Sequence, residues 1–158
     1  MKNRKRNRLW GYDYSRDDLY YVTICVRGMI CCFGEIIPAP IPNPADPSFP
    51  NSLNPPNPIP SPKTMSLNEY GGIVQAGLLW LPDQYPYVVL HNYVVMPNHV
   101  HAIIEIDSSK VKNMVIKIKS LSSLIGAFET TSPKMIHIAG YADFFVASFL
   151  LWPHHQNR

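Results

Sequence analysis

The sequence predicts an α+β domain in which helices pack on one face of an antiparallel sheet. Short runs of β-branched and aromatic residues alternate with two longer segments whose apolar residues recur at helical spacing. Their order is strand, strand, helix, strand, strand, helix. This order favours a sandwich that leaves the second sheet face open to a ligand. A length of 158 residues suits one domain with a single core.

Two strands are expected before the first helix. Residues 19–26 (LYYVTICV) are rich in aromatic and β-branched side chains, as strands are. Residues 31–37 (CCFGEII) predict the second strand, with a turn near Arg27 and Gly28.

Residues 38–62 interrupt this pattern with proline. The segment holds eleven of the sixteen prolines in the chain. Because each proline fixes φ and removes a backbone donor, neither a helix nor an interior strand can run through it. We interpret the segment as an extended, solvent-exposed insertion that joins two structured parts. A proline-rich ligand for a partner domain is the alternative.

The first helix is expected to begin at Ser66 and to end at Pro82. Ser66 and Glu69 have the spacing of a capping box, with a carboxylate three residues after a hydroxyl. Proline cannot continue the helix because it has no backbone N–H. The apolar stripe between these limits consists of Leu67, Tyr70, Val74, Leu78 and Leu81.

The second half of the chain predicts a hairpin and a helix. Residues 88–96 and 99–106 are the expected strands, with Pro97 and Asn98 in the turn. A helix is expected over 110–129, with lysines mostly off its apolar stripe. That stripe consists of Val111, Val115, Ile118, Leu121, Ile125 and Phe128.

Composition points to a cytoplasmic protein. No stretch approaches the ~20 apolar residues of a membrane span, and the N-terminus lacks the pattern of a signal peptide. The three cysteines, Cys25, Cys31 and Cys32, form neither a CxxC pair nor a metal-finger spacing. Cys25 lies in an apolar run, so we interpret it as a small buried side chain.

The formal net charge of +3 is too small to indicate a nucleic-acid partner, but it is unevenly distributed. The first eight residues contain five cations: Lys2, Arg4, Lys5, Arg6 and Arg8. Such an arm can follow the phosphate backbone of DNA. A solvated tail accounts for the same charges equally well.

His99 and His101 are candidate metal ligands. Because side chains alternate across a strand, both point to one face, about 7 Å apart along the chain. Val100, Ala102, Ile104 and Ile106 then point into the core. Two neutral imidazoles can bind one divalent cation, which can polarise a phosphodiester. Two solvated histidines are the alternative. Glu105 shares their face and is interpreted as an exposed, solubilising carboxylate.

Six blocks of the sequence, taken in order, form a recognisable series. They are 12–15 (YDYS), 19–25 (LYYVTIC), 33–36 (FGEI), 67–71 (LNEYG), 93–101 (YVVMPNHVH) and 117–128 (KIKSLSSLIGAF). This series resembles the REP-associated tyrosine transposases of the HUH single-strand endonuclease superfamily. The similarity covers roughly residues 5 to 145, with 38–62 as an unusual expansion.

This resemblance implies a ferredoxin-like sandwich that binds hairpin-forming single-stranded DNA on its open face. It also implies that His99 and His101 hold Mg²⁺ or Mn²⁺, and that the protein pairs as a homodimer. The family's nucleophile is a tyrosine on a later helix, which forms a 5′-phosphotyrosine with the DNA. Rejoining then needs no nucleotide cofactor.

The resemblance lapses after Phe144. Residues 146–158 can be encoded by a set of codons that also has meaning in a shifted frame. When these codons are translated from one base later, they give W-Q-A-S-Y-Y-G-H-I-I-R, which resembles the family's next strand. We therefore expect a frameshift near Phe145, an aberrant tail at 146–158 and no catalytic nucleophile. Tyr141 matches a different family position and is not expected to replace the nucleophile.

The expected organisation is a basic N-terminal arm, a split domain, an insertion and a tail. The corresponding ranges are 1–18, 19–37 with 63–145, 38–62 and 146–158. Three functions remain open: a transposase that has lost cleavage, a non-catalytic module for single-stranded or hairpin DNA, and a metal-free structural remnant. The sequence holds no GxSxG motif, P-loop or dinucleotide-binding glycine pattern.

Overall fold

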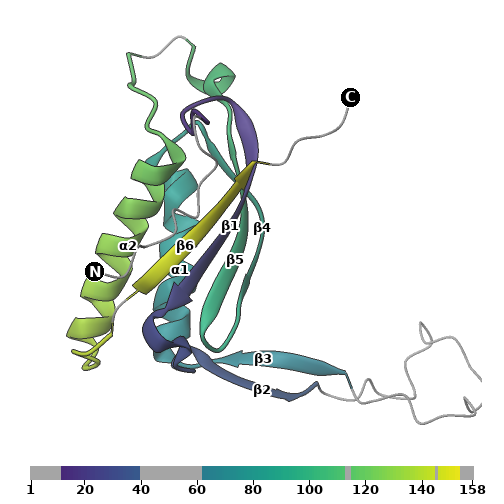
Figure 1. Ribbon diagram of the computed structural model, residues 1–158, viewed down its shortest axis with the longest axis vertical. Helices are drawn as coiled ribbons and strands as arrows, with labels where there is room; N and C mark the ends of the chain where they lie inside the picture. Colours follow the sequence, from purple (N-terminus) through teal and green to yellow (C-terminus); the bar gives the residue numbers. More distant parts are fainter. Residues whose placement is uncertain (1–11, 40–61, 113–114, 145, 154–158) are drawn as a thin grey trace, which may run out of the picture.

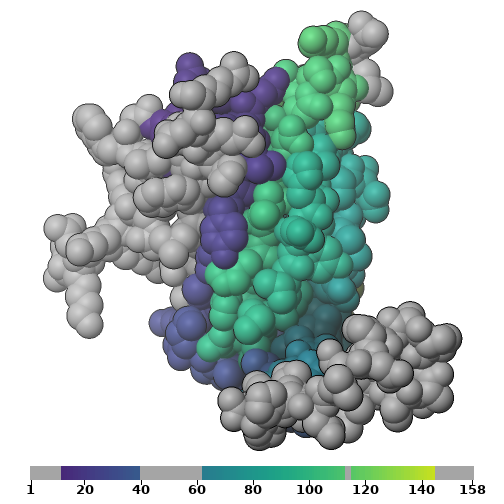
Figure 2. Space-filling view, turned by 90° about the vertical axis from the view of Figure 1, so that its right-hand side faces the viewer, coloured from purple at the N-terminus to yellow at the C-terminus, as the bar shows by residue number. Residues whose placement is uncertain are grey.

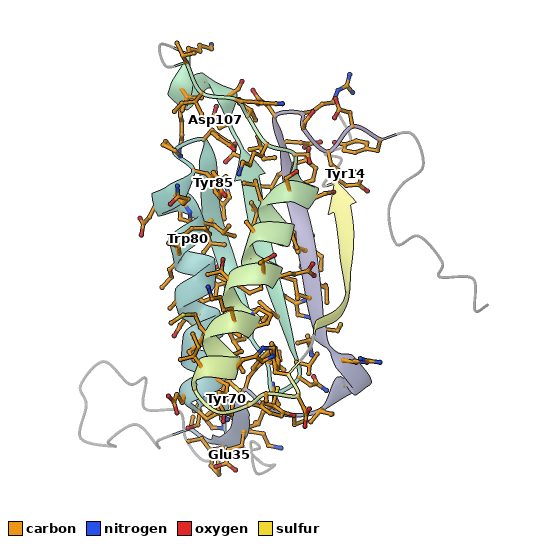
Figure 3. All side chains as sticks on the ribbon, turned by 90° about the vertical axis from the view of Figure 1, so that its left-hand side faces the viewer. Tyr14, Glu35, Tyr70, Trp80, Tyr85 and Asp107 are labelled. Atoms are coloured by element: carbon orange, nitrogen blue, oxygen red, sulfur yellow. The ribbon has the colours of Figure 1, made fainter. Side chains whose placement is uncertain are left out.

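A four-stranded antiparallel sheet carries two helices on one face (Figures 1 and 3). The computed structural model describes residues 12–39, 62–112, 115–144 and 146–153, the last range as backbone only. The strand order is β4-β5-β1-β6, with β1 at Asp18–Val26, β4 at Val88–Val95, β5 at His99–Ile106 and β6 at Val146–Pro153. The helices are α1, Glu69–Gln84, and α2, Leu121–Ile138. The predicted α+β class and one-sided helical layer are confirmed.

The order of elements along the chain is that of a ferredoxin-like fold. Strand β1, helix α1, strands β4 and β5, helix α2 and strand β6 give the pattern β-α-β-β-α-β. A separate hairpin is inserted between β1 and α1. It consists of β2, Gly34–Pro38, and β3, Lys63–Leu67, and Figure 1 shows it projecting from the end of the sheet where α1 begins.

The core lies between the sheet and the two helices. Alternation places Val100, Ala102, Ile104 and Ile106 of β5 in it, as the sequence predicts, each at most 1% exposed. From the helices, Leu78 and Leu81 of α1 pack against the same layer as Leu124 and Ile125 of α2.

The start of α1 corrects the predicted capping box. Asn68, and not Ser66, is the N-cap, and its side-chain oxygen accepts from Gly71 N at 3.0 Å. Ser66 and Leu67 stay extended because they pair with Glu35 and Gly34 in the β2–β3 hairpin. This pairing is between strands from either side of the proline-rich segment, so periodicity alone did not reveal it.

The end of α1 corrects a second boundary. Pro82 lies inside the helix, which continues to Gln84. Proline removes one bond in the last turn, but Tyr85 N still donates to Leu81 O at 2.9 Å. The predicted boundary was therefore slightly early.

The second helix also begins later than predicted. Ser120 caps α2 at Leu121, and Leu121 N donates to Tyr14 O at 2.8 Å. Upstream of that cap, Val111 is buried in a short 3₁₀ turn at Ser108–Val111, whereas Val115 is fully exposed. The apolar stripe predicted over 110–129 therefore combined residues of two separate elements, the 3₁₀ turn and α2. The buried face of α2 consists of Leu121, Leu124, Ile125, Phe128, Ser132 and Ile136.

Both ends of the domain reach further than the sequence suggested. Tyr14, assigned to the N-terminal arm, is 7% exposed and packs in the core. Residues 146–153, assigned to a tail, form β6 and pair with β1 from Tyr20↔Pro153 to Val26↔Val146. The domain boundaries drawn at 18 and 145 therefore fall within the fold. The insertion at 38–62 lies mostly outside the described residues, as does the basic arm.

No helix in the described part of the chain has the length and apolar character to cross a bilayer.

Candidate functional site

The sheet face opposite the helices carries a line of polar and aromatic side chains, which we call the open face. Figure 2 looks onto it, with β1 (purple) beside β5 and β4 (teal to green). Strand register and alternation place twelve residues of β1, β4 and β5 on it: Leu19, Tyr21, Thr23, Cys25, Val89, His91, Asn92, Val94, His99, His101, Ile103 and Glu105. Cys25 is half-buried on this face and not buried in the core as predicted.

His99 and His101 lie together on the open face, as predicted. Both are half-buried, and their ring centroids are 4.7 Å apart at an interplanar angle of 75°. Val100, between them, points into the core at 1% exposure. Strand alternation therefore sets the pair, and the core residues around it fix the register.

Backbone hydrogen bonds hold the β4–β5 turn that precedes the pair. Cys32 N and Phe33 N both donate to Pro97 O, at 2.9 and 3.0 Å. Val26 N donates to Asn98 O at 2.9 Å. The connection after β1 thus anchors the turn, so His99 enters the sheet at a defined position.

Asn98 sets the orientation of the His99 ring. Its Nδ2 donates to Met29 O at 3.1 Å, which directs its Oδ1 toward His99. The distance from that Oδ1 to His99 Nδ1 is 2.7 Å. Because an amide oxygen only accepts, Nδ1 carries the proton, and Nε2 of the neutral ring has the free lone pair. Metal-ligating histidines typically have such a partner on their other nitrogen.

His101 is held by β1. Its Nδ1 is 2.9 Å from Thr23 Oγ1, a hydroxyl that can donate or accept. Its ring also stacks on Tyr21, with centroids 5.3 Å apart and an interplanar angle of 25°. Burial, and to a lesser extent the neighbouring His99, lowers the pKa of the His101 imidazole. The neutral form, which binds metals, is therefore favoured.

The pair offers two nitrogen ligands to a cation. Among the residues that the structure describes, no group of three or more His, Cys, Asp or Glu side chains could hold a metal ion. A cation on His99 and His101 would complete its coordination with water or with oxygens of a bound ligand. Nitrogen ligands suit Mn²⁺ better than Mg²⁺, which prefers oxygen. The donor set and its hydrogen-bonded partners therefore fit the predicted cation site.

Of the other candidate residues, Glu105 and Tyr141 lie in the described part of the chain and the five basic residues do not. Glu105 is on the open face, but its Oε2 pairs with His91 Nε2 at 2.7 Å. Tyr141 packs against Tyr70 and Phe144, with ring centroids 5.5 and 6.1 Å away, and so belongs to an aromatic cluster next to the helices. The predicted DNA-binding residues all lie outside the described part of the chain: Lys2, Arg4, Lys5, Arg6 and Arg8.

The sequence did not identify Thr23, Tyr21 or Asn98 as parts of this site. Thr23 and Tyr21 come from a strand nearly eighty positions away, and only the β1–β5 register brings them to the pair. Asn98 is adjacent to His99 in the sequence, so its polar side chain could have been predicted to contact the His99 ring.

Comparisons with known proteins support the fold. No family model matches the sequence. A Haemophilus influenzae protein described as uncharacterized is 31% identical over 106 residues, which are 67% of this chain and 46% of that protein. The chain thus spans about half the length of this relative. The solved structure of a REP-associated tyrosine transposase bound to a REP hairpin has a TM-score of 0.50 and 11% identity, covering 99% of this chain and 64% of that one. At this identity, the likeness shows a shared ferredoxin-like architecture.

Proposed function

We propose that this chain is a transposase-like DNA-binding protein whose open face takes single-stranded or hairpin DNA. In this proposal His99 and His101 hold a divalent cation, Mn²⁺ or Mg²⁺, beside a DNA phosphate. The observation that carries the proposal is the arrangement of the pair: two adjacent imidazoles, oriented by Asn98 and Thr23, on the sheet face opposite α1 and α2.

The fold comparison supports a nucleic-acid ligand in particular. The structural neighbour is described as bound to a REP hairpin, and its fold extends over nearly all of this chain. A flat sheet face with an exposed aromatic side chain is also a common platform for unpaired bases. Tyr21, 41% exposed next to the pair, is such a side chain.

Each residue of the site has a distinct role in this proposal. The rings of His99 and His101 bind the cation through Nε2, while Asn98 and Thr23 keep those rings in place. When bound, the cation supplies positive charge that polarises a phosphodiester and stabilises negative charge on its oxygens. The arm residues Lys2, Arg4, Lys5, Arg6 and Arg8 are proposed to bind the DNA backbone.

A non-catalytic binding module is the second candidate. Its support is that Tyr21, which lies against the pair, is engaged in a ring stack with His101. That packing suits a platform for DNA better than a nucleophile. Under this candidate, DNA is held and not cut, and no phosphotyrosine forms.

A labelled hairpin oligonucleotide with a single-stranded flank tests both candidates. With Mn²⁺ present, a protein–DNA adduct that survives denaturation indicates cleavage through a tyrosine, which mass spectrometry then locates. Salt-sensitive retention without an adduct indicates binding alone. If the hairpin is not retained at low salt, the proposed DNA-binding function is wrong.

A matched pair of variants tests the cation site. Titration with Mn²⁺ should show one site in the wild-type protein. Binding is measured as the loss of the EPR signal of free Mn²⁺. The site should be lost in the His99→Ala/His101→Ala double variant and retained in His137→Ala, which changes a histidine that bonds to Phe144 O. Equal Mn²⁺ binding by all three proteins would refute the site.

A further inference from the structure

A shallow hollow lies beside the histidine pair on the open face. Its volume is about 300 Å³, at the lower end of the range for small-molecule sites. Strands β1, β4 and β5 line it with Tyr21, Asn92, Tyr93, Val94, His101, Ala102 and Ile103. The hollow therefore shares His101 with the proposed cation site.

A β-bulge in β4 turns Asn92 into this hollow. The register with β5 shifts between Leu90 and Asn92, so that Asn92 pairs with Ile103 on the open face. After the shift, the Tyr93 side chain points toward the helix layer, where Gln75 Nε2 donates to its hydroxyl oxygen at 3.1 Å. Strict alternation from His91 would instead place Tyr93 outward and Asn92 inward. Bulges commonly re-aim a side chain in this way next to a functional site.

The side chain of Asn92 is available to a ligand. It is exposed, and its amide makes no hydrogen bond to the part of the chain that the structure describes. An amide offers one acceptor and two donors, and can therefore pair with the polar edge of a base. His91, its neighbour, is occupied by its bond to Glu105.

The remaining walls suit a flat apolar ligand. Tyr21 is 41% exposed and Val94 is 42% exposed, although both lie on a sheet face. The Tyr21 ring is kept in place by its stack on His101. A fixed aromatic ring, aliphatic side chains and one free amide match the apolar faces and polar edge of a nucleobase.

We propose that this hollow is a subsite for one unpaired nucleobase, stacked on Tyr21 and hydrogen-bonded at its edge by Asn92. The inference rests on the proposed function, because the phosphate of the same strand would lie at the histidine pair. Base stacking would then fix which phosphate of a single strand reaches His99 and His101.

Two single-stranded probes of equal length test the subsite. One is a fluorescein-labelled mixed-sequence 20-mer, and the other has the same backbone with tetrahydrofuran abasic units in place of its bases. The dissociation constant of the abasic strand, divided by that of the mixed-sequence strand, measures what the bases contribute to binding. Tyr21→Ala should reduce that ratio by about 5- to 30-fold, because stacking of one base is lost. Asn92→Ala should reduce it by a smaller factor and should bind the abasic strand as tightly as the wild-type protein does.

Two control variants accompany the test. Tyr21→Phe keeps the ring and should keep the wild-type ratio. Leu79→Ala removes an equally exposed side chain, 47% exposed, from α1 on the opposite layer, and should have no effect. Circular dichroism and thermal unfolding confirm that each variant is folded.

The outcomes separate the subsite from the function on which it rests. Binding with a ratio that Tyr21→Ala leaves unchanged overturns the subsite and leaves the DNA-binding function in place. Failure of the wild-type protein to bind either strand overturns both. A ratio that falls for Tyr21→Ala and is retained in Tyr21→Phe supports the subsite.

Discussion

Asn98 determines which nitrogen of His99 is available on the open face. Its amide is oriented by Met29 O, and its oxygen accepts the Nδ1 proton of His99. Met29 has a left-handed backbone conformation, φ 57°, which is uncommon outside glycine. The orientation of the His99 ring therefore depends on the loop after β1, whose Met29 carbonyl group holds the Asn98 amide.

Replacing Asn98 by alanine should weaken Mn²⁺ binding by about tenfold, the lower limit for loss of a partner to a metal-ligating histidine. The physical reason is that the His99 ring can then rotate or protonate on Nε2. Asn98→Asp retains an acceptor oxygen and should bind Mn²⁺ more tightly than Asn98→Ala. Isothermal titration calorimetry measures both affinities, and equal affinities in the two variants would contradict this role.

The three cysteines should differ in reactivity at pH 8. Cys31 is exposed, whereas burial raises the pKa of the Cys25 thiol and raises that of Cys32 to about 11. A raised pKa keeps the thiol protonated, so only about one Cys32 molecule in a thousand is the reactive thiolate at pH 8. Ellman's reagent should therefore label Cys31 first. The other two should follow as the pH rises or the protein unfolds, and simultaneous labelling of all three would contradict the burial.

At the scale of single residues, sequence reasoning found the histidines but not their partners. Alternation along a strand is a local property, so the shared face of His99 and His101 could be predicted from residues 99–106 alone. Thr23 became part of the site only through the β1–β5 register. Register depends on tertiary packing, which local patterns do not specify.

At the scale of elements, the contact between α1 and α2 is close enough to require a glycine. A Cβ at Gly77 would lie 2.5 Å from Ser132 Oγ and 3.1 Å from the Phe128 ring. Ser132 is buried, and its hydroxyl has no hydrogen-bond partner within the described structure. Packing at this contact is therefore already tight, and one polar group in it is unsatisfied.

Gly77→Ala should lower the free energy of unfolding by about 1–3 kcal/mol through overpacking. Gly72, with no atom within 4 Å of a built Cβ, is the matched control in the same helix. Gly72→Ala should raise that free energy by about 0.4–1 kcal/mol, because alanine loses less backbone entropy on folding. Urea denaturation measures both, and a rise in the free energy of unfolding for Gly77→Ala would show that the helices are not closely packed.

The β2–β3 hairpin should not need the proline-rich segment. Its strands pair from Gly34↔Leu67 to Pro38↔Lys63, and Ala39 N donates to Pro62 O at 2.6 Å beyond them. Replacing residues 40–61 by Asn-Gly should therefore keep the fold and raise the free energy of unfolding by up to about 2 kcal/mol, because a shorter loop closes at lower entropic cost. Loss of cooperative urea unfolding would show that the segment contributes to the core.

Helix boundaries were the least predictable elements. Apolar spacing located both helices, but a polar side chain decided where each begins: Asn68 for α1 and Ser120 for α2. The alternative cap at Ser66 was unavailable because that residue pairs in β3. Ser66 and Asn68 are both good N-cap residues, and the pairing of β3 with β2 decides between them. The sequence pattern did not show that pairing.

At the scale of the whole molecule, the sequence predicted the sandwich and its open face. The fourth strand was missed because residues 146–153 no longer resemble the family pattern, and yet β6 pairs with β1 along most of its length. Residues 146–153 still include Val146, Phe149 and Trp152, which are residue types enriched in strands. The frameshift stays a prediction, and the nucleotide sequence of the locus tests it. The homodimer stays a proposal, which light scattering after gel filtration can test.

His99 and His101 are proposed to hold a cation against bound DNA on the open face. Anomalous diffraction from crystals grown with Mn²⁺ and a hairpin oligonucleotide measures this directly. We expect a manganese peak within bonding distance of His99 Nε2 and His101 Nε2, with a phosphate oxygen on the same ion. A phosphate backbone bound away from this face, with no manganese at the two rings, would contradict it.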